Sequence, residues 1–150
     1  MKKLIIIALE MVLTSITMCG LYGCIENRTP ETVLKSMFGI SLKDFDYIVD
    51  TFEEQGNFSD WQLIAVFKFN KLTQENIDYL KEFNPQPLPI PDTIPICQKM
   101  SYNKIPRQFF KADTGYYLYR PDKDRPAYRD FKIFIIDTKK KVAVLYFQHG

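Results

Sequence analysis

The segment 131-FKIFIIDTKKKVAVLYFQ-148 holds two apolar runs rich in β-branched and aromatic residues, separated by a short charged stretch. Runs of this composition on either side of a polar turn predict a β-hairpin. Both runs carry apolar side chains at odd and at even positions, and strands that are apolar on both faces are usually covered on both. We therefore expect this hairpin at the centre of a sheet, with Lys139, Lys140 and Lys141 in an exposed turn.

Three more strands are expected outside this hairpin. Residues alternate with a period of two over 44–52 and again over 61–70, the pattern of a half-buried strand. Residues 53–60 contain a Gly-Asn pair and are typical of a turn that would join these two strands into an antiparallel hairpin. The aromatic run at 115–120 predicts a fifth strand.

Two helices are expected from their end signals. In 29-TPETVLKSMFG-39, Thr29 can cap the helix, the proline that follows suits the first helical position, and Gly39 can end it. A second helix, within 72–83, would be capped by Thr73.

A proline-rich stretch follows the second expected helix. Proline is excluded from helix interiors and from central strands, so this stretch is expected to form an extended connector. Its prolines are Pro85, Pro87, Pro89, Pro91 and Pro95. Together these patterns predict an α+β fold, an antiparallel sheet of about five strands with two helices on one face.

The composition is that of an ordinary folded chain. Aromatic residues make up 15% of it, with 12 Phe and 9 Tyr but only 6 Gly, which favours sheets over disorder. The net charge is +2, but it is divided unevenly. Residues 24–98 carry 12 acidic and 6 basic side chains, and residues 99–150 carry 5 acidic and 12 basic ones. Two solvated faces of one sheet explain such a division most simply.

The chain begins MKKLIIIALEMVLTSITMCGLYGC, two lysines followed by a long apolar run. A basic start, an apolar stretch and small residues before a cleavage point are the pattern of a secretory signal. A permanent transmembrane helix would place Glu10 deep in the bilayer, which costs about 2–3 kcal/mol. A buried core helix would need a polar face and a cap, and this stretch has neither.

The end of this run, Leu21-Tyr22-Gly23-Cys24, resembles the lipobox of bacterial lipoproteins. In that family an aliphatic residue precedes the cleavage point, a small residue stands directly before it, and the cysteine thiol receives diacylglycerol. The resemblance implies that Leu21 and Gly23 are read by the signal peptidase and that Cys24 carries the lipid.

The resemblance also implies an organisation for the whole chain. Residues 1–23 would be the signal peptide, 24–29 a lipid-anchored tether, and 30–150 a single α+β domain. The protein would be held in a bacterial cell envelope through lipid on Cys24. Because Ile25 rather than Asp follows that cysteine, the family's sorting habits favour the outer membrane where a cell has two membranes.

Two alternatives for the N-terminal region stay open: an uncleaved anchor, and a secreted form in which Cys24 pairs with Cys97. If Cys24 is lipidated, Cys19 leaves with the signal and Cys97 is the sole remaining thiol. We then expect Cys97 to be a small buried apolar residue.

Few residues suggest catalysis or cofactor binding. The sequence has no phosphate-binding glycine loop, no nucleophile elbow and one histidine, His149. Asp44, Asp46 and Asp50 would share one strand face, but a single strand supplies too few ligands for a metal ion. An envelope hydrolase would need a cleft that gathers Asp46, Asp50 or Glu53. We expect no enzyme activity and no cofactor.

The region 107–132 interleaves arginines with aromatic residues, a mixture that binds anionic partners by charge and stacking. An acidic protein, an anionic lipid headgroup or a glycan suits such a surface; a nucleic acid is not expected outside the cytoplasm. Alternatively, the tyrosines fill a sheet face and the arginines are solvated. The candidate surface consists of Arg107, Arg120, Arg125, Arg129, Tyr117 and Tyr119.

The sequence therefore predicts a membrane-anchored envelope lipoprotein with a small non-catalytic binding domain. An inhibitor or immunity-type protein, secreted or anchored, is the alternative.

Overall fold

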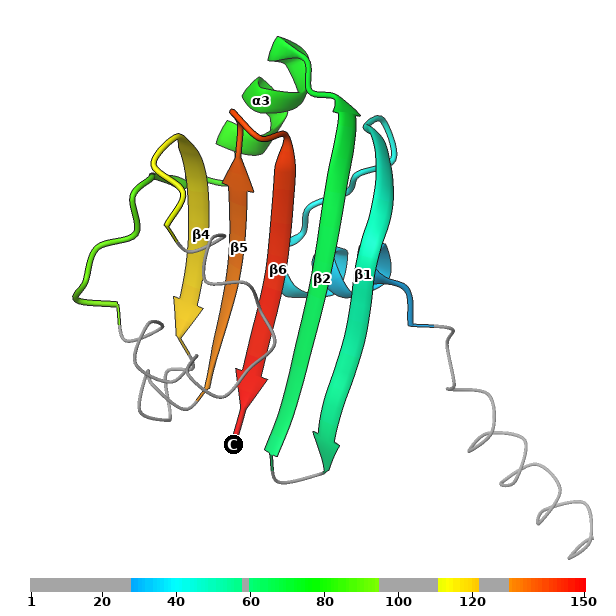
Figure 1. Cartoon of the computed structure of the whole chain (residues 1–150), viewed down its shortest axis with the longest axis vertical. Coiled ribbons are helices and arrows are strands. Elements are labelled where there is room, and N and C mark those ends of the chain that lie inside the picture. The colour runs from blue at the N-terminus through cyan, green and yellow to red at the C-terminus, as the bar shows by residue number, and fades with distance from the viewer. Residues whose placement is uncertain (1–27, 58–59, 95–110, 122–129) are drawn as a thin grey trace, which may run out of the picture.

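The computed structural model describes residues 28–57, 60–94, 111–121 and 130–150. They form an antiparallel sheet of six strands in the order β1-β2-β6-β5-β4-β3 (Figure 1). The strands are β1 (Asp46–Asn57), β2 (Asp60–Lys71), β3 (Gln86–Pro87), β4 (Gly115–Pro121), β5 (Phe131–Asp137) and β6 (Val142–His149). The helices are α2 (Pro30–Phe38) and α3 (Gln74–Lys81).

The sheet has six strands and not about five, because the proline-rich connector supplies one. Gln86 and Pro87 pair with Tyr117 and Tyr116 at the outer side of β4. Proline has no N–H to donate, but an edge strand needs partners on one side only. The expected exclusion of the connector from central strands therefore agrees with the structure, and its short edge strand accounts for the sixth strand of the sheet.

The expected turn at 53–60 is also corrected. β1 continues to Asn57, which pairs with Asp60, and only residues 58–59 lie between the paired strands, outside the described residues. The register of β1 shifts between Val49 and Thr51, which is the effect of an extra residue in one strand of the pair. The hairpin of β1 and β2 is thus longer than the alternating residues 44–52 and 61–70 indicate, because its pairing continues to Asn57 and Asp60.

The central position of the β5–β6 hairpin is confirmed. β6 pairs with β2 on one side and with β5 on the other, and β5 also pairs with β4. Both faces of this hairpin are buried, in two separate clusters. Lys139, Lys140 and Lys141 are exposed in the turn, where Asp137 Oδ1 accepts hydrogen bonds from the first two of their backbone N–H groups at 3.1 and 2.9 Å.

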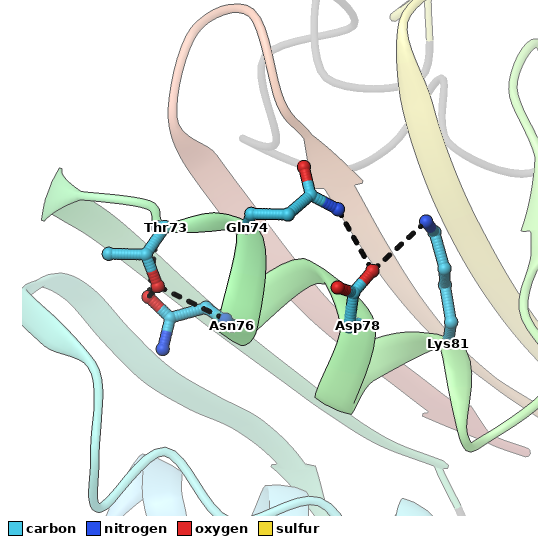
Figure 2. Close-up of polar contacts among 5 residues, drawn as sticks. All are labelled: Thr73, Gln74, Asn76, Asp78 and Lys81. Atoms are coloured by element: carbon cyan, nitrogen blue, oxygen red, sulfur yellow. Dashed lines mark hydrogen bonds and ion pairs between the residues drawn. The ribbon is translucent and has the colours of Figure 1, made fainter.

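Both helices begin at the predicted threonines. Thr29 caps α2, and Gly39 ends it with a left-handed φ of 80°. In α3, Thr73 Oγ1 accepts from the Asn76 backbone N–H at 3.2 Å, while Asn76 Oδ1 accepts from the Thr73 N–H at 3.0 Å (Figure 2). This reciprocal bonding satisfies N–H groups that the first helical turn leaves without partners.

The outer surface of α3 carries a second polar contact. Gln74 Nε2 and Lys81 Nζ donate to Asp78 Oδ1 at 2.9 and 3.2 Å (Figure 2). These bonds, with that from Gln74 foremost, lower the pKa of the exposed Asp78 carboxyl. The contact ties neighbouring helical turns together, as side chains three and four residues apart do on a helix surface.

Both helices cover the same face of the sheet, as expected. The main core joins α2 and α3 to alternate residues of β2, β5 and β6. Figure 1 shows α2 behind the middle of the sheet and α3 at one end, while the C-terminus lies at the other end. The buried residues of this core are Val33, Leu34, Phe38, Ile40, Leu42, Leu63, Ala65, Phe67, Phe69, Leu80, Leu118, Phe134, Ile136, Ala143 and Leu145.

A smaller cluster lies on the opposite face. Leu88, Ile90 and Ile94 of the connector pack there against side chains of β4, β5 and β6. The connector therefore covers part of the sheet that no described helix covers. The buried members of this cluster are Leu88, Ala112, Tyr117, Phe131, Ile133, Ile135 and Tyr146.

Of the helices in the described ranges, none is both long and apolar enough to cross a membrane. Cys24 and the expected signal peptide lie outside the described residues, as does Cys97.

Candidate functional site

The structure divides the predicted anionic-partner surface between two faces of β4. Tyr117 and Tyr119 point to the face that carries the connector cluster. Arg120 points to the helix face, where its Nη1 donates to the Met37 carbonyl at 3.0 Å and its guanidinium lies 5.1 Å from the centroid of the Phe38 ring. Arg120 thus binds the C-terminal end of α2, where the last carbonyls lack helical partners.

The other arginines of that surface, Arg107, Arg125 and Arg129, lie outside the described residues. Their part of the surface stays a prediction.

An open hollow of about 280 Å³ borders the two tyrosines. Burial raises the pKa of the Tyr119 hydroxyl. None of the described residues that line the hollow is charged; they are Asn84, Gln86, Ile94, Tyr117, Leu118 and Tyr119. Two amides and two phenols beside apolar carbons suit a small neutral polar group that stacks on an aromatic ring.

A buried carboxylate close to the C-terminus was missed by sequence reasoning. Asp130 is 2% exposed, and its Oδ1 lies 2.8 Å from His149 Nδ1 and accepts from the Gly150 N–H at 2.9 Å. From the sequence, His149 is notable only as the one histidine, close to the C-terminus. The register of the β5–β6 hairpin would have predicted this contact, because pairing Phe131 with Gln148 sets Asp130 beside His149.

A second group that was missed lies on the helix face, at the end of the sheet that carries the C-terminus. The rings of Trp61 and Phe147 meet edge to face at 4.9 Å between centroids, and His149 stacks on Phe147 at 6.5 Å. The Arg28 guanidinium lies 5.3 Å from the Trp61 ring, and Lys132 Nζ lies 6.0 Å from the Phe147 ring. These five residues are called the Trp61 patch below.

The Trp61 patch gathers residues from four separate segments of the chain. They are brought together by the pairing of β2 with β6, which sets Trp61 opposite His149, and of β5 with β6, which sets Lys132 opposite Phe147. Local composition carries no sign of this arrangement. Only a correct strand order and register would have predicted it.

The acidic residues of β1 form no enclosed site. Asp46 Oδ1 accepts from Asn70 Nδ2 at 2.8 Å, Asp50 pairs with Lys68, and Glu53 is exposed. Asp44 lies in the turn before β1. Within the ranges described, no three His, Cys, Asp or Glu side chains are grouped so that they could hold a metal ion. These carboxylates lie on the open surface of the edge strand β1 and of the turn before it.

Comparison with protein-family models, with curated proteins and with solved structures gave no match to this chain.

Proposed function

We propose that this chain is a lipid-anchored protein of a bacterial cell envelope, and that its folded part is a non-catalytic binding module. The observation that carries the proposal is the ending Leu21-Tyr22-Gly23-Cys24, placed directly after a basic start and an apolar run. A thiol at that position, followed by only a few residues before α2 begins at Pro30, would hold the module close to the membrane surface.

The binding part of the proposal is supported by the hollow beside Tyr117 and Tyr119. Its volume of about 280 Å³ is slightly below the range of small-molecule sites, about 300–1,000 Å³. It therefore suits one polar unit of a larger partner, such as a sugar ring of an envelope glycan or a side chain of an envelope protein. Because the described lining is uncharged, a neutral polar unit fits it better than an anion.

Anchoring is tested by Cys24→Ala in cells supplied with a labelled fatty acid. We expect the wild-type protein to carry the label and to sediment with membranes. Cys24→Ala should lose the label and accumulate as uncleaved precursor, because no thiol is left at the end of the lipobox to accept diacylglycerol. Cys19→Ala and Cys97→Ala are matched controls and should behave as wild type. Label remaining on Cys24→Ala would contradict the proposal.

Binding is tested at the hollow with two tyrosine variants. Tyr119→Ala removes a ring that lines the hollow, whereas Tyr116→Ala removes a neighbouring ring that does not line it. An envelope component bound stoichiometrically by wild type should be lost from Tyr119→Ala and kept by Tyr116→Ala. If the component were lost from Tyr116→Ala and kept by Tyr119→Ala, the binding site would lie on the other face of β4, which would contradict the proposal.

A further inference from the structure

The Trp61 patch lies on a part of the sheet that neither of the described helices covers. α2 and α3 cover the middle and one end of their face, and the patch occupies the opposite end, beside the C-terminus (Figure 1). Trp61 and Phe147 pack against the edge of the main core and are only partly buried. Part of each ring is therefore open to solvent at the rim of the main core.

The chemistry of this patch is that of a membrane interface. Tryptophan is enriched at the headgroup level of membranes because its ring is apolar and its N–H is polar. Arg28 and Lys132 flank the rings, and long basic side chains lay their stems on apolar surface while their charges reach phosphates. Arg28 also pairs with Glu54 at 3.9 Å, with 63% and 31% of the side chains exposed. An ion pair that is this exposed contributes little to stability, so Arg28 can still contact a headgroup.

The position of Arg28 in the chain links this patch to the expected anchor. Arg28 is four residues after Cys24, so their Cα atoms are at most about 14 Å apart. The side chain of the same Arg28 lies over Trp61. A lipid on Cys24 would therefore keep the patch close to the headgroup layer, whatever path residues 25–27 take.

We propose that the Trp61 patch is the surface with which the domain rests on the headgroup layer of the membrane that holds the lipid of Cys24. This inference rests on the proposed anchoring. The inference also gives the anchored domain an orientation. The end of the sheet with the C-terminus faces the membrane, and the turn at 138–141 faces away from the membrane.

The test uses the fluorescence of Trp61, the only tryptophan in the chain. Mature lipidated protein, beginning at Cys24, is reconstituted in vesicles of phosphatidylcholine and phosphatidylglycerol, about three to one. The emission is compared in matched vesicles whose acyl chains carry bromine, which quenches a tryptophan that lies in the interface. We expect quenching of roughly half the emission, because a ring at headgroup level is close to the upper acyl chain.

Two double variants separate the patch from the overall charge. Arg28→Glu/Lys132→Glu should reduce the quenching at least about twofold, because two carboxylates beside the rings are repelled by anionic headgroups. Lys139→Glu/Lys141→Glu makes the same change in net charge at the far turn and should leave the quenching as in wild type. Both variants should remain attached to the vesicles through their acyl chains.

The outcomes distinguish this inference from the anchoring on which it rests. Labelled, vesicle-bound protein whose Trp61 emission is unaffected by brominated lipid would overturn the orientation and leave the anchoring intact. Equal loss of quenching in both double variants would also overturn it, because net charge would then be the cause. Wild-type protein without fatty acid would overturn the anchoring, and this inference with it.

Discussion

Tyr47 connects the edge strand β1 to helix α2 through one side-chain contact. Its hydroxyl donates to Glu31 Oε1 at 2.9 Å. Burial and this bond to a carboxylate disfavour the phenolate and raise the pKa of Tyr47 from 10.0 to about 12. The pKa of Tyr47 thus indicates whether β1 and α2 are in contact.

The raised pKa predicts a pH dependence of stability. The unfolded chain releases the Tyr47 proton near pH 10 and the folded chain only near pH 12, so this stabilisation is complete below pH 10 and is lost as the pH rises to about 12. Tyr47→Phe should therefore be less stable than wild type below pH 10, and the difference should narrow towards pH 12. Urea unfolding across this range measures it, with Tyr116→Phe as the control. A difference that stays constant would contradict the assigned pKa.

At the scale of single elements, the cap of α3 makes a separate prediction. Thr73→Ala removes the oxygen that accepts from the Asn76 N–H and should lower the free energy of unfolding by about 1 kcal/mol. Thr73→Ser keeps that oxygen and should lose much less. The measurement is urea unfolding of the chain produced without residues 1–23 and with Cys24→Ser. Equal losses in the two variants would mean that the methyl group, and not the hydrogen bond, is responsible.

The elements that the sequence predicted are those with local signals. Threonine caps, a glycine stop and two-residue alternation depend on neighbouring residues, so α2, α3 and the strands around β5 and β6 were expected from them. β3 was missed because its pairing partner, Tyr117 in β4, is remote in sequence. The reach of β1 was underestimated because Gly56 is typical of a turn, although it pairs with Trp61 inside the hairpin.

The candidate sites were predicted less well than the fold, for a related reason. Consecutive residues of a strand point to opposite faces of the sheet, so Tyr119 and Arg120 cannot share one face. The prediction of a single aromatic and basic surface did not take this into account. The hollow, the contact of Asp130 with His149 and the Trp61 patch all depend on strand order and register. Those are decided by the packing of the whole sheet.

At the scale of the whole molecule, stability should reside in the central hairpin. Ile135 and Leu145 are at most 1% exposed and lie on opposite faces of the sheet. Truncating either to Ala should cost about 2–5 kcal/mol. Replacing the exposed Lys139, Lys140 and Lys141 together by Ser should cost almost nothing. Urea unfolding gives both values, and the reverse order would contradict the assigned sheet.

The central claim is that a lipid on Cys24 holds this sheet at a membrane. The most direct measurement is the intact mass of the wild-type protein extracted from bacterial membranes, with fragmentation to locate any modification. The account predicts a chain that begins at Cys24 and carries diacylglycerol on that thiol. A chain that still contains residues 1–23, or one that begins elsewhere without lipid, would contradict it.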